Sequence, residues 1–196
     1  MKRIVLTDGG MGQELLRRSG AAPTPLWSAR VLIDEPDLVR DLHADFIDAG
    51  ARVITINTYA ATPERLEREG VGELFEELQQ RGIDLAKQAR DMTGADVRIA
   101  GCLPPLFGSY KPELTLSFDE TLEIYRRVVA AQKDQVDLIL CETMASAEEA
   151  LAAATAASEA SLPVWVSWTL QDSLDGAQLR SGETIEEAAK AIAHIK

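Results

Sequence analysis

The sequence has little of what builds metal centres and nucleophile–base pairs: its 196 residues include two cysteines and two histidines. Cys102 and Cys141 have no C-x-x-C or histidine neighbour at zinc-site spacing, which favours buried apolar side chains over metal ligands. His43 and His194 lie in helical segments rather than at strand ends, so packing or surface positions are expected, and no Ser-His-Asp arrangement follows. So few cysteines also argue against a small disulfide-stabilised secreted domain, and we expect a cytoplasmic protein with reduced thiols.

Basic charge and long apolar runs are scarce too. The chain has 20 Lys and Arg against 32 Asp and Glu, a formal net charge of -12, which argues against nucleic acid or an anionic membrane as a partner. No apolar run approaches the roughly 18 residues of a membrane span, and the N-terminal run is too short for a signal peptide. Gly9, Gly10 and Gly12 do not have the G-x-G-x-x-G spacing of a dinucleotide site. Small molecules remain as the expected ligands.

Five apolar, β-branched runs are present. They are continuous rather than alternating, which is typical of strands buried on both faces of a parallel sheet. The predicted strands are 3–8, 52–59, 97–103, 136–143 and 163–170.

Helical patterns separate these runs. A helix is predicted over 36–49, starting at Pro36 and ended by Gly50, and the interval 63–93 is long enough for two helices, the second closed by Gly94. An alanine-rich tract at 150–161 predicts a helix packed closely on a sheet. Reciprocal capping boxes are predicted at three helix starts, Ser117-x-x-Glu120, Ser146-x-x-Glu149 and Thr184-x-x-Glu187.

Strand–helix alternation predicts an α/β fold, in which an open sheet with helices on both faces competes with a closed (β/α)8 TIM barrel. Polar or special residues after each strand favour the barrel, because the carboxyl ends of its strands meet at one mouth where catalytic groups gather. About five strand–helix units are recognisable, whereas a barrel needs eight. We therefore expect residues 1–196 to be a single barrel domain truncated at its C-terminus, or a fold closed by other means. Exposed sheet edges in such a domain predict self-association into a homo-oligomer.

Two carboxylates stand out at strand ends. Asp8 follows the first predicted strand and is either a ligand-binding carboxylate or a turn residue that accepts hydrogen bonds from nearby amides. Glu142 ends the most apolar strand, VDLILCET, where a carboxylate must be held by partners or by a ligand because burying it alone is costly. Trp168, near another strand end, is either core or the wall of a pocket.

Several motifs in order resemble the homocysteine S-methyltransferase family. They are TDGGMGQELLRRSG, PLWSARVLIDEPDLVRDLHADFIDAGARVITINTYAATPERL and LILCETMASAEEA, and the resemblance runs from about residue 5 to about residue 170. It implies a (β/α)8 barrel that moves a methyl group from a sulfonium or similar donor to the thiolate of homocysteine, forming methionine. It also implies a Zn2+ ion, held by three cysteine thiolates, that deprotonates the substrate thiol.

The resemblance assigns substrate-binding roles to five residues. Asp8 and Glu142 correspond to strand-end carboxylates that receive the ammonium of homocysteine, while Gly9, Thr58 and Tyr59 line the same pocket. The family's zinc ligands belong to later motifs that this sequence does not contain, so no metal ligand is predicted in this chain. The third strand end, GCLPPLFGSY, departs from the family's Gly-Ser-x-Gly-Pro pattern, which leaves the pocket wall and the methyl donor open.

Two other functions remain open from the residues. A shortened barrel that keeps the amino-acid pocket without the metal would be a non-catalytic binding or assembly module. An unrelated barrel enzyme would use Asp8 and Glu142 as an acid/base pair.

Overall fold

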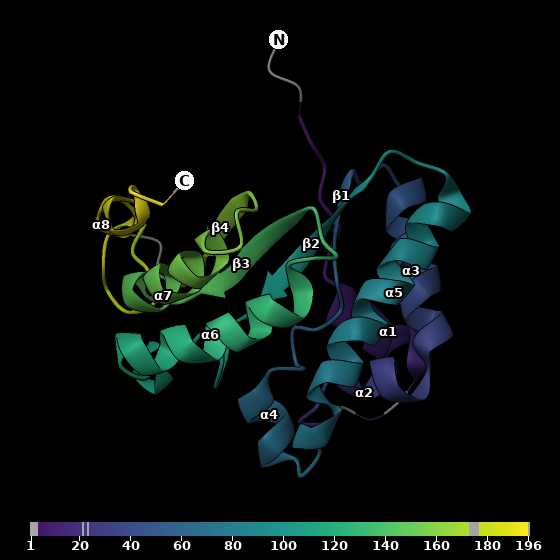
Figure 1. The fold of residues 1–196 in the computed structure, drawn as a ribbon, viewed down its shortest axis with the longest axis horizontal. Coiled ribbons are helices and arrows are strands. Elements are labelled where there is room, and N and C mark those ends of the chain that lie inside the picture. The colour runs from purple at the N-terminus through teal and green to yellow at the C-terminus, as the bar shows by residue number, and fades with distance from the viewer. Residues whose placement is uncertain (1–3, 21, 23, 173–176, 196) are drawn as a thin grey trace. The chain divides into compact units, whose positions relative to one another are not determined.

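A computed structural model describes residues 4–20, 22, 24–172 and 177–195. The fold is α/β, with four strands and eight α-helices among these residues (Figure 1). The chain divides into two compact units, which we call the first unit (Met1–Cys102 with Gln135–Asp137) and the second unit (Leu103–Asp134 with Leu138–Lys196). None of the described helices combines the length and apolarity that a membrane crossing requires.

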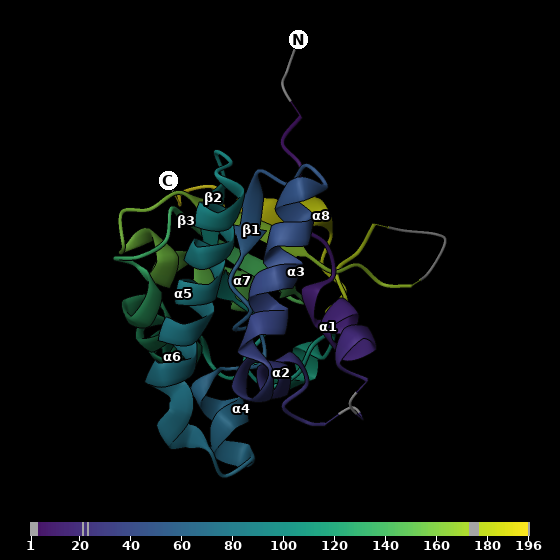
Figure 2. The same cartoon turned by 90° about the vertical axis from the view of Figure 1, so that its right-hand side faces the viewer.

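The first unit holds five of the helices and two parallel strands. Its two strands pair in parallel, with Val53 opposite Arg98 and Thr55 opposite Ala100. Helices α3 and α5 lie side by side (Figures 1 and 2). The elements are α1 (Met11–Ser19), α2 (Ser28–Asp34), α3 (Pro36–Asp48), β1 (Val53–Thr55), α4 (Pro63–Arg68), the 3-10 turn η1 (Gly72–Leu74), α5 (Phe75–Thr93) and β2 (Arg98–Leu103).

The second unit holds the other three helices and the second parallel pair. The alanine-rich tract forms the buried helix α7, which packs on both strands of this unit and on α6, so the prediction of an alanine helix on a sheet is confirmed. The small side chains let the helix axis approach the strands closely. The elements are η2 (Pro112–Leu114), α6 (Phe118–Gln132), β3 (Leu138–Met144), α7 (Ala147–Ser158), β4 (Val164–Trp168) and α8 (Ile185–Ile192).

Helix boundaries follow the sequence signals closely. Helix α3 begins at Pro36, and Gly50, with φ 110°, follows its end. Gly94 ends α5 in the left-handed conformation with φ 63°, which a residue without Cβ adopts at little cost. The reciprocal capping boxes at Ser117 and Thr184 are both present. These predictions are confirmed.

The predicted strand 3–8 is wrong as a strand buried on both faces. In its described part, Thr7 makes one parallel bridge to Val53, and Ile4 and Leu6 remain 92% and 53% exposed. Among the described residues this segment runs along one neighbour, so its apolar side chains are not covered. The other predicted strands are present but shorter, and β4 is only half-buried.

Helix α2 was not expected, because it has no capping signal. Its N-cap residue is Trp27, whose backbone adopts φ 45°, an uncommon conformation for a bulky side chain.

The capping box predicted at Ser146, at the start of α7, forms only in part. Its hydroxyl accepts a hydrogen bond from the Glu149 amide at 3.2 Å, but the Glu149 carboxylate is engaged elsewhere.

Candidate functional site

Asp8 lies where the N-terminal segment leaves β1. Its amide donates to the Val53 carbonyl oxygen at 3.0 Å. Its Oδ2 accepts a hydrogen bond from the Thr55 amide at 2.7 Å, and its Oδ1 lies 3.3 Å from the Thr55 hydroxyl. The half-buried carboxylate is therefore oriented by a neighbouring strand, through a partner 47 residues away that the sequence did not indicate.

Gly9 is required by close packing. A Cβ at this position would lie 2.9 Å from the Cε1 atom of Phe46, on α3. Any side chain would push the turn or the ring away, so the backbone beside Asp8 is placed by α3.

Thr58 and Tyr59 follow β1 in the same unit. Thr58 is buried, and its hydroxyl oxygen has no hydrogen-bond partner among the described residues. The half-buried Tyr59 ring meets Trp27 edge-on, with centroids 5.9 Å apart at 80°, and the guanidinium of Arg65 lies 5.4 Å from its centre. These contacts hold the Tyr59 ring in one orientation.

Helix α5 controls the position of Thr58. Glycine in a helix interior usually costs about 0.5–1 kcal/mol relative to alanine, but a Cβ on Gly82 would lie 2.7 Å from the Thr58 Cγ2 atom. We therefore expect Gly82→Ala to lower the free energy of unfolding by about 1–2 kcal/mol. The clash of the new Cβ with Thr58 costs more than the higher helix propensity of alanine contributes. Urea unfolding measures this change.

A double variant provides the control. Thr58→Ser removes only the Cγ2 methyl, so Gly82→Ala combined with Thr58→Ser should recover most of the loss seen with Gly82→Ala alone. Equal stability of the single and double variants would contradict a clash at this methyl.

Glu142 lies at a β-bulge in the second unit. Cys141 pairs with Val166 and Met144 with Trp168, so three steps along β3 match two along β4. Thr143 takes up the extra residue with φ 63°, a strained conformation for a β-branched side chain. Bulges of this kind redirect side chains and are frequent beside active sites. Glu142 thus stands at the most irregular point of this strand pair.

The chain just after this bulge is held firmly. The Thr169 amide donates to the Met144 carbonyl oxygen at 2.8 Å, and the Ser181 hydroxyl donates to the Ala145 carbonyl oxygen at 2.9 Å. These bonds come from two different segments of the second unit. The backbone around Thr143 is therefore overdetermined, which is how a strained residue persists.

Trp168 ends β4 and is half-buried. Its indole N–H is buried without a hydrogen-bond partner among the described residues. An indole N–H usually finds a partner when it is buried, and the half-buried position of Trp168 suits a pocket wall as well as the core.

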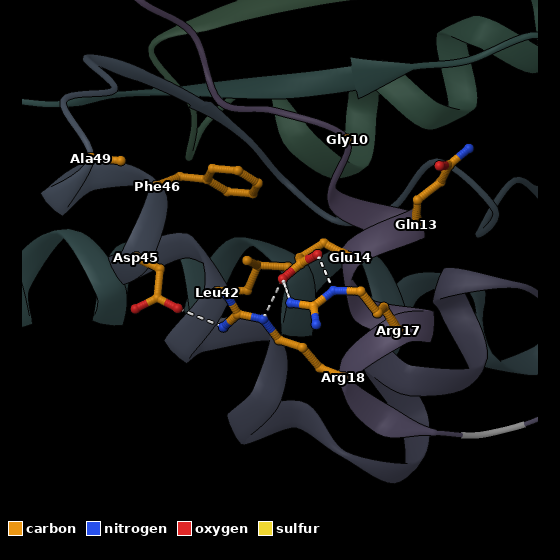
Figure 3. Close-up of a pocket in the computed structure, with 9 residues that line it drawn as sticks. All are labelled: Gly10, Gln13, Glu14, Arg17, Arg18, Leu42, Asp45, Phe46 and Ala49. Atoms are coloured by element: carbon orange, nitrogen blue, oxygen red, sulfur yellow. Dashed lines mark hydrogen bonds and ion pairs between the residues drawn. The ribbon is translucent and has the colours of Figure 1, made fainter.

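A separate cavity of about 560 Å³ lies between α1 and α3 (Figure 3). Glu14 lies between Arg17 and Arg18, and Arg18 reaches Asp45 at 2.5 Å. Hydrogen bonds from Arg17, then Arg18, lower the pKa of Glu14 to about 2. The guanidinium groups of Arg17 and Arg18 are thus paired with the carboxylates of Glu14 and Asp45. None of the predicted site residues lines this cavity. Its lining residues are Gly10, Gln13, Glu14, Arg17, Arg18, Leu42, Asp45, Phe46 and Ala49.

The described residues do not fit the zinc ion that the resemblance implies. No group of three or more His, Cys, Asp or Glu side chains suited to a metal occurs among them. Cys102 and Cys141 are buried, and desolvation raises the pKa of the Cys141 thiol, whereas metal ligation needs a thiolate. No step of the chemistry is therefore assigned to zinc in this chain.

Comparison with known proteins settles the family. A family model described as homocysteine S-methyltransferase matches residues 5–196. The chain belongs to the homocysteine S-methyltransferase family. It is 33% identical to a homocysteine S-methyltransferase of Escherichia coli (strain K12), over 90% of this chain and 63% of that protein. A selenocysteine methyltransferase of Astragalus bisulcatus is 32% identical, over 94% of this chain and 63% of that protein.

A solved structure agrees with this family. The metallated form of the homocysteine methyltransferase MmuM from Escherichia coli superposes with a TM-score of 0.86 at 28% identity, covering 99% of this chain and 72% of that one. The chain covers 63% of the length of each of the two methyltransferases compared by sequence above, slightly less than two thirds.

Proposed function

We propose that this chain carries the homocysteine-binding part of a methyltransferase that transfers a methyl group from a sulfonium or similar donor to the thiolate of homocysteine, forming methionine. The family match over residues 5–196 is the observation that carries this proposal. The (β/α)8 barrel is part of the same proposal, and the parallel strand pairs of the two units are compatible with it.

In this proposal Asp8 and Glu142 are the carboxylates that receive the substrate's ammonium group. Asp8 suits this role because the Thr55 amide orients it while it remains half-buried. Glu142 suits it because it is half-buried and lies at the strained bulge of β3, next to Thr143. Gly9, Thr58 and Tyr59 complete the set as lining residues, placed by Phe46, α5 and Trp27 as described above.

Calorimetry with two ligands tests the binding step. Homocysteine and 4-mercaptobutanoate share the thiol and the carboxylate, but only homocysteine has an ammonium group. We expect homocysteine to bind at least about tenfold more tightly, because a charge-assisted hydrogen bond contributes about 1.5–3 kcal/mol. Equal affinity for the two ligands would contradict carboxylate recognition of the ammonium.

A second measurement separates the enzyme from the non-catalytic module. The native protein, which in the methyltransferase proposal supplies the zinc ligands that the described residues lack, is incubated with homocysteine and with S-methylmethionine as the donor, and methionine is quantified by mass spectrometry. Methionine formation supports the methyltransferase. Binding without methionine formation, also when S-adenosylmethionine is the donor, would favour the module.

A further inference from the structure

The chain leaves β2 through two consecutive prolines, Pro104 and Pro105. Proline has no amide hydrogen, so the Leu106 amide is the first backbone donor after Leu103. All of Leu103, Pro104, Pro105 and Leu106 are buried, so the polar groups of this segment need partners inside the protein.

Two buried side chains provide these partners. The Tyr125 hydroxyl, on α6, donates to the Pro104 carbonyl oxygen at 2.9 Å. The Glu149 Oε1 atom, on α7, accepts from the Leu106 amide at 3.3 Å and lies 3.4 Å from the Tyr125 hydroxyl. Tyr125 is 0% and Glu149 4% exposed. We call Tyr125 and Glu149 the proline clamp.

The proline clamp also reaches the end of β3. The Tyr125 hydroxyl lies 4.0 Å from the sulfur of Met144, two residues after Glu142. Met144 is the residue whose carbonyl is held by Thr169. One phenol therefore touches both the segment that follows β2 and the strand end that carries Glu142.

The cost of this arrangement argues for a role beyond capping. In the other two capping boxes the glutamates, Glu120 and Glu187, are exposed and bond the start of their own helix. Glu149 has the same place relative to its N-cap Ser146, yet its carboxylate turns into the protein and bonds Leu106. Burying a carboxylate is expensive, so an exposed cap would be the cheaper arrangement.

We propose that Glu149 and Tyr125 are positioning residues that fix the segment after β2 as a wall of the homocysteine site beside Glu142. The assignment of this wall to homocysteine rests on the proposed function. In this proposal, two side chains that do not touch the substrate hold the segment GCLPPLFGSY, which differs from the family pattern, in its position. A rigid wall raises the affinity for a ligand because the binding geometry is already formed, so less conformational entropy is lost on binding.

Hydrogen exchange and calorimetry together test this proposal. Glu149→Leu removes the acceptor and Tyr125→Phe removes the hydroxyl, while Glu149→Gln keeps an acceptor oxygen. We expect the Leu106 amide to exchange at least about tenfold faster in Glu149→Leu, and homocysteine affinity to fall about tenfold, since one lost hydrogen bond is worth roughly one factor of ten. Tyr125→Phe should show a smaller loss of affinity. Glu149→Gln should behave like the wild type.

Glu120→Leu is the matched control. It removes a glutamate at the same capping position of α6, so it should lower the free energy of unfolding without changing Leu106 exchange or homocysteine affinity. Wild-type exchange and affinity in folded Glu149→Leu and Tyr125→Phe would overturn the proposal. Failure of the wild-type protein to bind homocysteine would instead overturn the proposed function and the substrate assigned to this wall. Faster Leu106 exchange in the same variants would still establish the clamp.

Discussion

Replacing Asp8 with asparagine is expected to weaken homocysteine binding by about 10- to 100-fold, because the neutral amide oxygen lacks the negative charge that strengthens the hydrogen bond donated by the substrate's ammonium. The amide oxygen of asparagine can still accept from Thr55, whose amide lies 2.7 Å from Asp8 Oδ2. The fold should therefore persist, and titration calorimetry with urea unfolding measures the two effects separately.

Asp137 provides a matched control for this substitution. Its Oδ2 accepts from the Ile99 amide at 2.7 Å, the same kind of bond to a strand that Asp8 makes, but it lies before β3 rather than after a strand. Asp137→Asn should leave homocysteine affinity unchanged. If Asp8→Asn also left the affinity unchanged, Asp8 would be a structural turn residue and not a ligand-binding carboxylate.

The stability of the protein is expected to fall by about 2 kcal/mol between pH 7 and pH 5 because of His43. This side chain is fully buried on α3, both ring nitrogens are without hydrogen-bond partners among the described residues, and desolvation lowers its pKa to about 3. The folded state keeps the imidazole neutral, whereas the unfolded chain binds a proton below about pH 6.5. Stability is thus fully present above pH 6.5 and decreases by up to about 1.4 kcal/mol per pH unit down to pH 3.

Two histidine variants isolate this effect. In His43→Leu the loss between pH 7 and pH 5 should largely disappear, and stability at pH 7 should rise by about 1 kcal/mol because buried unpaired nitrogens are removed. His194→Leu, at an exposed position after α8, should retain the wild-type pH dependence. Urea unfolding at both pH values is the measurement, and a wild-type protein equally stable at pH 7 and pH 5 would contradict a neutral buried His43.

Local signals predicted elements well where a few neighbouring residues decide the conformation. Pro36 and Gly50 delimit α3, and Gly94 ends α5, because proline and glycine restrict or free the backbone dihedrals by themselves. No local signal marks the start of α2, whose N-cap Trp27 adopts φ 45°. No short-range preference favours that conformation, so the start of α2 depends on the packing of the Trp27 ring against Gly12 and Tyr59.

The same division holds for the candidate site. Strand-end position singled out Asp8 and Glu142, and these remain the residues we propose to bind substrate. Thr55 and the bulge at Thr143 carried no recognisable signal, although Thr55 orients the Asp8 carboxylate and the bulge is the local backbone of Glu142. Glu149 had a signal, the capping pattern, but that pattern predicts a bond to its own helix start.

The order of residues alone was enough to establish the α/β class, several helix ends and membership of the methyltransferase family, since these depend on periodicity and on motifs read within short segments. Folding in three dimensions decided that His43 is buried, that Asp8 is held by Thr55 and that Glu149 bonds the segment after β2. The reason is physical: the environment of a side chain is created by segments tens of residues away, and burial and hydrogen bonding have no counterpart in a local pattern.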